Sequence, residues 1–292
     1  MREHFVSNIA RDSRRWADGL LAGMVWLAAM LIAIAFCWIV GDLLWHGLSH
    51  VSWQFLVSAP ENAGREGGIG PILVSTLLIL GVCLIVALPI GLGTAFFLSE
   101  LSLAYQGLGR WIRLSLEVLA GVPSIVFGLF GNAFFCKVLG LGFSILAGGL
   151  TLACMVLPIL IRTTEEGLRS VPREYRLGGA ALGFSQTTLL RQVLLPSALP
   201  GLTVGLILGV GRSLAETAAL IFTSGYVDRM PSSLLDSGRS LSIHIFDLSM
   251  NVSGGNDNAY ASAIVLLLLL LFINALASGL SEYWLKETLP TR

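Results

Sequence analysis

The 292-residue sequence has few charged residues. Asp, Glu, Lys and Arg make up 12% of the chain, about half of their share in ordinary soluble domains. Eighteen basic residues balance eighteen acidic ones, so the chain as a whole has no electrostatic attraction for nucleic acid. Apolar residues make up 55%, more than the interior of a soluble domain of this size can bury. The composition therefore predicts an integral membrane protein.

The sequence also lacks the motifs of common enzyme classes. Its two lysines, Lys137 and Lys286, do not follow a glycine, so there is no G-x-x-x-x-G-K-[ST] phosphate loop. No serine lies in G-x-S-x-G. His46 and His50 are four residues apart without a third ligand nearby, and the four cysteines are scattered through apolar stretches. We therefore predict no catalytic residues and no cofactor or metal bound by this chain; an intramembrane enzyme is the least supported class.

Six apolar regions are long enough to cross a bilayer, which takes about 20 residues. They are residues 19–41, 67–99, 118–136, 138–161, 197–226 and 258–281. The fifth region is interrupted by Arg212 and Glu216. Backbone polar groups must be satisfied inside the membrane, so these regions are expected to be helices. The predicted fold is an all-α integral membrane protein with six transmembrane helices over residues 19–285.

Basic residues flank the predicted spans unevenly. Thirteen lie near the span ends on one side, four lie on the other side, and Arg212 lies inside the fifth span. Since Lys and Arg concentrate in cytoplasmic loops, we expect both termini, residues 1–18 and 286–292, to face the cytoplasm. The first span is too long for a signal-peptide core and its basic flank also carries acids, so we expect it to be retained. Residues 227–258 then lie on the outer side.

The longest cytoplasmic connection is residues 162–196. Pro172 suits the first turn of a helix, Glu174 favours the positive helix end, and Gly183 can end the helix in a left-handed conformation. Ser185 is a candidate N-cap for a second short helix, and Pro196 marks the boundary to the next span. Its apolar residues are Leu177, Ala180, Ala181, Leu182 and Phe184. The connection is either a docking element for a partner or a loop resting on its own chain.

Arg212 and Glu216 are four residues apart, so the sequence predicts that they share one helix face. An unpaired charge in lipid is costly. The two residues form either an internal ion pair that fixes helix packing or part of an anion pathway, because a guanidinium matches phosphate or carboxylate oxygens with forked donors. Arg162, at the end of the fourth span, is most simply a cytoplasmic anchor with its head group at the membrane surface.

Several segments resemble the permeases of bacterial ABC importers, and most closely the A-type permease of the high-affinity phosphate importer. Ala-Ala-Leu-Gly (180–183), nine residues and then Val-Leu-Leu-Pro (193–196) resemble the cytoplasmic signature of these permeases. The segment from Arg212 to Leu220 resembles R-x-x-G-E-T-A-P-L, with Ala215 for the glycine and Ala219 for the proline. Further matching features are Gly-Gly-Ile-Gly-Pro (67–71), Leu-Ser-Glu (98–100), Gly-Val-Pro-Ser-Ile-Val-Phe-Gly (121–128) and Asn274. The family's usual Glu-Ala-Ala is replaced by Leu-Gly-Gly at 177–179.

The resemblance implies an ABC importer permease fold, whose cytoplasmic coupling-helix segment inserts into a groove on a separate ATPase subunit. By position, the residues expected to couple to the ATPase are Glu174, Ala180, Ala181, Gly183, Leu195 and Pro196. The residues expected along the substrate pathway are Arg162, Arg212, Glu216 and Thr217.

The implied function is ATP-driven import of inorganic phosphate across the bacterial inner membrane. The implied partners are two copies of a P-loop ATPase that bind ATP and Mg, a second permease subunit that completes a heterodimer, and a periplasmic phosphate-binding protein. The outer segment is either a surface for that binding protein or an ordinary solvated loop. Two alternatives stay open: a permease for another oxyanion or organic phosphate, and an ion-coupled secondary carrier that transports without an ATPase.

Overall fold

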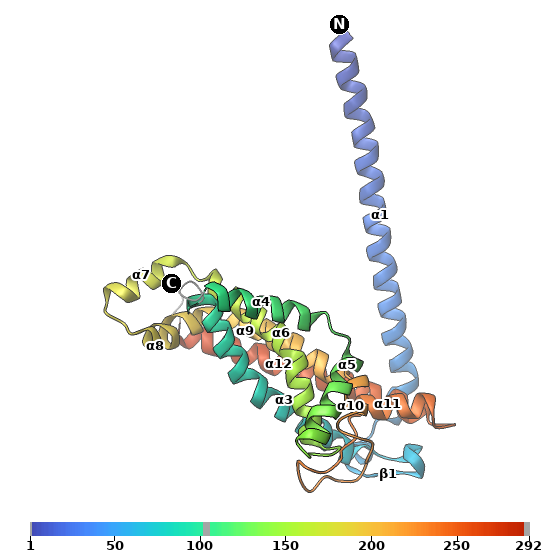
Figure 1. The fold of residues 1–292 in the computed structure, drawn as a ribbon. Helices are drawn as coiled ribbons and strands as arrows, with labels where there is room; N and C mark the ends of the chain where they lie inside the picture. Colours follow the sequence, from blue (N-terminus) through green and yellow to red (C-terminus); the bar gives the residue numbers. More distant parts are fainter. Residues whose placement is uncertain (1, 102–105, 289–292) are drawn as a thin grey trace.

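The computed structural model describes residues 2–101 and 106–288, with side chains described for 18–101 and 107–283. Met1 of the predicted N-terminal segment and residues 289–292 of the predicted tail lie outside this part. Figure 1 shows a helical bundle containing α3, α6, α9 and α12, with the long helix α1 reaching it only at the end beside α11. The short helices α7 and α8 lie at the opposite end of the bundle (Figure 1).

The long helices are α1 (Arg2–Gly47), α3 (Gly70–Phe96), α6 (Ile145–Ser170), α9 (Leu195–Ala215) and α12 (Asn256–Thr288). The shorter ones are α2 (Trp53–Val57), α4 (Gln106–Ala120), α5 (Ser124–Gly131), α7 (Arg173–Ala181), α8 (Gln186–Leu189), α10 (Ala218–Ile221) and α11 (Leu241–Met250). Segments of π-helix at Phe97–Leu101, Asn132–Val138 and Leu190–Leu194 continue α3, α5 and α8. Short 3-10 turns lie at Leu48–His50 and Asn62–Gly64, and β1 (Pro60–Glu61) pairs antiparallel with β2 (Glu66–Gly67).

Among the described residues, five helices are long and apolar enough to cross a membrane. The pair formed by α4 and α5 adds a sixth span if it is counted as one, which agrees with the predicted number. The third span is not a straight helix, because α4 and α5 are bent by 105° relative to each other. Pro123 causes the break: its backbone is extended (φ −60°, ψ 144°), and proline disfavours helical backbone in the residue before it.

The fifth span also differs from the prediction. Helix α8, the π-helical segment and α9 run without interruption from Gln186 to Ala215, so Pro196 lies inside a helix and not at a boundary. The π-helical turn at Leu190–Leu194 already departs from the i→i−4 pattern that a proline disrupts, which explains why the helix continues through Pro196. The helix then ends at Ala215 and not near Tyr226.

Helices α6 and α9 approach each other through small residues. A Cβ atom added to Gly201 of α9 would lie 2.7 Å from the Cα of Gly167 on α6, and one added to Gly209 would lie 2.7 Å from Val156 Cγ1. Close helix packing in membranes depends on such small side chains. This crossing places Arg162 and Arg212, on α6 and α9 respectively, in one helix pair.

Candidate functional site

Arg212 and Glu216 lie on either side of a helix break. Arg212 is half-buried in the last turn of α9, whereas Glu216 has extended backbone (φ −74°, ψ 124°) and is 9% exposed. The prediction that both residues share a helix face is therefore wrong, because the helix ends between them. The carboxylate of Glu216 turns toward α10 and its Oε1 accepts a hydrogen bond from the N–H of Ala219 at 3.0 Å. Glu216 thus caps α10, the short helix that follows the break. Thr217, which lies between Glu216 and the start of α10, is half-buried.

A serine from the predicted outer segment stabilises this break. Ser242 Oγ, on α11, donates a hydrogen bond of 2.6 Å to the backbone carbonyl of Glu216. The hydroxyl of Ser240 lies 2.9 Å from that of Ser242, and Thr76 Oγ1 on α3 accepts a hydrogen bond from the N–H of Leu241. A broken helix leaves carbonyls that need a partner. Ser242 could not be found from local sequence patterns, since its partner is 26 residues away and pairs with it only in the folded chain.

Arg212 lies beside an apolar contact of α9 but is not part of it. Val210 and Leu214, two residues away on either side and so on a different helix face, are buried with Leu80 of α3 against partly buried leucines of α12. Within the part of the chain that the structure describes, no carboxylate forms an ion pair with Arg212, and Glu216 does not bond to it. Of the two readings of this pair, an internal ion pair is therefore absent from this structure. The guanidinium donors stay available to a negatively charged group.

Arg162 has a partner that the sequence did not reveal. Its Nη2 donates to Oε1 of Glu117 on α4 at 2.8 Å, and both side chains are about half exposed. Because Gly167 faces Gly201 across the helix pair, Arg162 and Arg212 lie at different levels, about 10 Å apart along the axes at 1.5 Å per residue. The structure does not bring the two predicted pathway arginines together.

A charged cluster surrounds Arg162 at its end of the bundle. The carboxylate of Glu165 accepts a hydrogen bond from Arg113 Nε at 3.1 Å and forms an ion pair with Arg169 Nη2 at 2.8 Å. The Glu165 side chain is only 10% exposed. An open cavity of about 180 Å³ lies here, lined by Arg113, Leu116, Glu117, Arg162, Glu165, Glu166 and Arg169. These ion pairs join α4 to α6, so Arg162 belongs to a link between two helices and stays a predicted pathway residue.

The connection between α6 and α9 contains the predicted turn at Gly183. Its φ of +72° is left-handed, its N–H bonds to the Ala180 carbonyl, and the N–H of Phe184 bonds to the Gly179 carbonyl. These two hydrogen bonds form the Schellman motif that ends a helix, and glycine is the preferred residue at its left-handed position. Ser185 caps α8 as predicted, by accepting the N–H of Thr188 at 3.1 Å.

Two details of the coupling segment differ from prediction. Pro172 is the residue before α7 and not part of its first turn. The second helix is not short, because it continues into α9. Glu174, Ala180 and Ala181 are exposed on α7, whereas Leu195 and Pro196 are half-buried further along the chain. Large apolar side chains are also exposed here: Tyr175 at 48%, Leu177 at 70%, Leu182 at 73% and Phe184 at 37%.

A family comparison identifies this arrangement of helices. The family model described as "Binding-protein-dependent transport system inner membrane component" matches residues 87–286. The chain belongs to this family. It is a multi-pass inner-membrane permease of the ABC importer type, which confirms the fold class and the resemblance deduced from the sequence.

Individual relatives agree with this family. The permease is 31% identical over 278 residues to the probable ABC transporter permease protein YqgI of Bacillus subtilis, covering 89% of this chain and 94% of that protein. It is 32% identical over 272 residues to the phosphate transport system permease protein PstA 2 of Mycobacterium bovis, covering 88% of each. A solved bacterial ABC transporter involved in alginate import matches with a TM-score of 0.63 at 13% identity, over 92% of this chain and 99% of that one. Importers of chemically different substrates thus share this fold.

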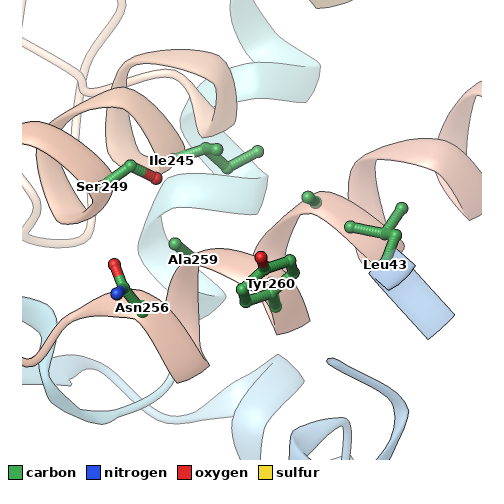
Figure 2. Close-up of a pocket in the computed structure, with 7 residues that line it drawn as sticks. Leu43, Ile245, Ser249, Asn256, Ala259 and Tyr260 are labelled. Carbon is green, nitrogen blue, oxygen red and sulfur yellow. The ribbon is translucent and has the colours of Figure 1, made fainter. Parts of the chain in front are cut away.

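A cavity of about 320 Å³ lies at the opposite end of the permease from α7. Figure 2 shows residues that line it, from the end of α1, from α11 and from the start of α12: Leu43, Ile245, Ser249, Asn256, Ala259 and Tyr260, with Ala263 completing the wall. The hydroxyl of Tyr260 donates to Asp42 Oδ2 at 3.2 Å, which joins α12 to α1. Neither Arg212 nor Glu216 lines this cavity, so it is separate from the predicted pathway.

The predicted outer segment of the permease is closely held by polar contacts. Arg239 donates from Nε to the Tyr226 carbonyl at 2.9 Å and pairs through Nη1 with Asp247 at 3.3 Å. His244 is 1% exposed beside them. The pKa of His244 is lowered to about 4, first by burial and then by the charge of Arg239, against the opposing effect of Asp228 and Asp247. The imidazole is therefore neutral at pH 7.

Acidification is expected to destabilise the permease through His244. Between pH 6.5 and pH 4 the unfolded chain binds a proton at this residue and the folded chain does not, so the free energy of unfolding rises with pH across this window. The contribution is about 2 kcal/mol smaller at pH 5 than at pH 7.5, from the ratio of protonated forms in the two states. Thermal unfolding in detergent at both pH values measures it. His244→Gln should remove this part of the pH dependence; an equal slope in that variant contradicts the assignment.

Proposed function

We propose that this chain is a translocation subunit of an ATP-driven importer of inorganic phosphate. A second permease subunit completes a heterodimeric pore, and two copies of a P-loop ATPase bind ATP and Mg and carry out hydrolysis. A periplasmic phosphate-binding protein delivers the substrate to the outer side. The permease itself is non-catalytic and moves between inward-open and outward-open states as the ATPases close and open.

The observation that carries the substrate assignment is Arg212. A half-buried guanidinium without an ionic partner in the described structure lies in the last turn of α9, beside a helix break. An arginine in such a place needs an anion, and its planar donors match two oxygens of a phosphate at once. Glu216, held at the same break, limits how tightly an anion binds through its own negative charge. Relatives named as phosphate transport permeases support phosphate as that anion.

The energy source must come from another subunit. The chain has no phosphate loop and its two lysines follow cysteine and leucine. The exposed apolar side chains on and after α7 offer the ATPase a docking surface. Residues 162–196 connect that surface directly to α6 and α9, the helices that hold Arg162 and Arg212.

Reconstitution in proteoliposomes tests the function. The chain is assembled with the second permease and the ATPase encoded with it, ATP and Mg are enclosed with the ATPase, and the binding protein and radiolabelled phosphate are added on the other side. We expect phosphate uptake that requires ATP, with sulfate and glycerol phosphate failing to compete. The test also includes vesicles that contain this chain alone, which should not accumulate phosphate.

Two results would overturn the assignment. If the assembled complex hydrolysed more ATP with an organic phosphate or another oxyanion but not with inorganic phosphate, the substrate would be wrong. If the chain alone concentrated phosphate against a gradient, it would be an ion-coupled carrier, and the role given to the ATPase would be wrong.

A further inference from the structure

Three arginines from different helices converge on the π-helical end of α3. Arg113 of α4 donates from Nη2 to the Leu98 carbonyl at 2.9 Å, and Arg169 of α6 donates to the same carbonyl at 3.5 Å. Arg176 of α7 bonds to Glu100, which lies two residues further along the same π-helical segment. A helix C-terminus carries partial negative charge, which attracts guanidinium groups. The end of α3 is therefore attached to the rest of the cytoplasmic face by charged hydrogen bonds.

Arg176 uses all of its nitrogen atoms. Nε lies 3.2 and 3.0 Å from the two carboxylate oxygens of Glu100, and Nη2 lies 2.7 Å from Oε1. Nη1 donates to the Val171 carbonyl at 2.8 Å and Nη2 to the Leu168 carbonyl at 2.9 Å. One guanidinium thus connects α7 both to the end of α3 and to the last turn of α6. The carboxylate of Glu100 raises the pKa of Arg176, so this link keeps its charge at any physiological pH.

Few other side chains of α7 face the protein. Of its nine residues, Arg176 is half-buried, Gly179 is buried, and the other seven are exposed. Gly179 has no side chain that could bond to a neighbouring helix. Arg176 is consequently the main side-chain attachment of α7 to the membrane-spanning helices in the described structure. A force applied to the exposed face of α7 reaches α3 through this residue.

We propose that Arg176 is a positioning residue that, through Glu100 and the Leu168 and Val171 carbonyls, transmits movement of α7 to α3 and α6. The inference rests on the proposed function, because it concerns how ATPase movement reaches the pore. Lysine cannot replace Arg176 fully, since a single ammonium cannot bond to a carboxylate and two separate carbonyls in this planar geometry. Loss of the link leaves the ATPase docked and active while α3 no longer follows α7.

The ratio of phosphate transported to ATP hydrolysed tests the proposal in the assembled transporter. Arg176→Gln should lower this ratio about tenfold, the effect of losing a charge-assisted hydrogen bond network, and Arg176→Lys should lower it less. Glu100→Gln removes the bonds to α3 but keeps those to the Leu168 and Val171 carbonyls, so it should lower the ratio by no more than Arg176→Gln. The double variant should be no worse than Arg176→Gln alone, because Glu100 acts through Arg176. Arg110→Gln, which removes an exposed charge from α4, is the matched control and should retain the ratio.

The outcomes separate this inference from the proposed function. Wild-type complex without ATP-dependent uptake contradicts the proposed function itself. Wild-type uptake with an unchanged ratio in Arg176→Gln overturns the role of Arg176 alone. If Arg176→Gln fails to assemble, the ratio of phosphate transported to ATP hydrolysed is measured in Arg176→Lys and Glu100→Gln instead. A parallel fall of hydrolysis and uptake in both, at a constant ratio, shows a structural role and also overturns the proposal.

Discussion

Replacing Arg212 with glutamine is expected to abolish phosphate uptake while the transporter still assembles. Glutamine keeps most of the side-chain length and hydrogen-bonding capacity but removes the positive charge, so an anion entering the bundle meets no compensating group. We expect the uptake rate to fall at least about 100-fold, because a desolvated charged hydrogen bond contributes several kcal/mol. Initial rates of ATP-dependent uptake in proteoliposomes measure the effect.

Three controls define this result. Co-purification of the ATPase and the second permease with the Arg212→Gln chain shows that assembly persists. Arg229→Gln removes a charge from the exposed outer surface and should transport normally. Arg212→Lys restores the charge without the planar donors and should recover only part of the rate. Normal uptake by the Arg212→Gln complex would remove the arginine from the pathway.

Replacing Leu182 with glutamate is expected to detach the ATPase. Leu182 follows α7, is 73% exposed, and lies next to the left-handed turn at Gly183. Covering a carboxylate with a partner surface costs several kcal/mol if it is not paired there. That loss corresponds to an affinity change of about 100-fold or more. Detergent-extracted complexes of the variant should lack the ATPase subunit.

The matched control uses a leucine on the opposite side of the membrane. Leu235 is 58% exposed in the outer segment, and Leu235→Glu introduces the same charge on a comparably exposed surface. It should leave the amount of co-purified ATPase unchanged. Retention of the ATPase by Leu182→Glu at wild-type levels, with normal hydrolysis, would place the docking surface elsewhere.

Local features of the sequence predicted the elements of this protein well. Hydropathy is a property of continuous stretches, so α1, α3, α6 and α12 follow from apolar runs alone. Capping also depends on neighbours in the chain, and this is why the turn at Gly183 and the cap at Ser185 form where predicted. The same local rules were insufficient at Glu216, where the helix ends inside an apolar run.

Pairings between distant residues could not be predicted. Arg162 and Glu117 are 45 residues apart, and Arg176 and Glu100 are 76 apart. The sequence suggested a different pair, Arg212 with Glu216, because four residues on a continuous helix would bring their side chains together. The helix ends between them, and Glu216 caps α10 instead.

The sequence by itself determined that this chain lies in a membrane, roughly where it crosses, and which exposed connection projects from the bundle. Those properties follow from the free energy of moving continuous segments out of water, which is nearly additive along the chain. The tertiary structure alone decided that Arg212 has no counter-ion among the residues whose side chains are described and that Arg176 joins α7 to α3. The strength of an ion pair depends on the distance between the two charges in space, and helix packing sets that distance.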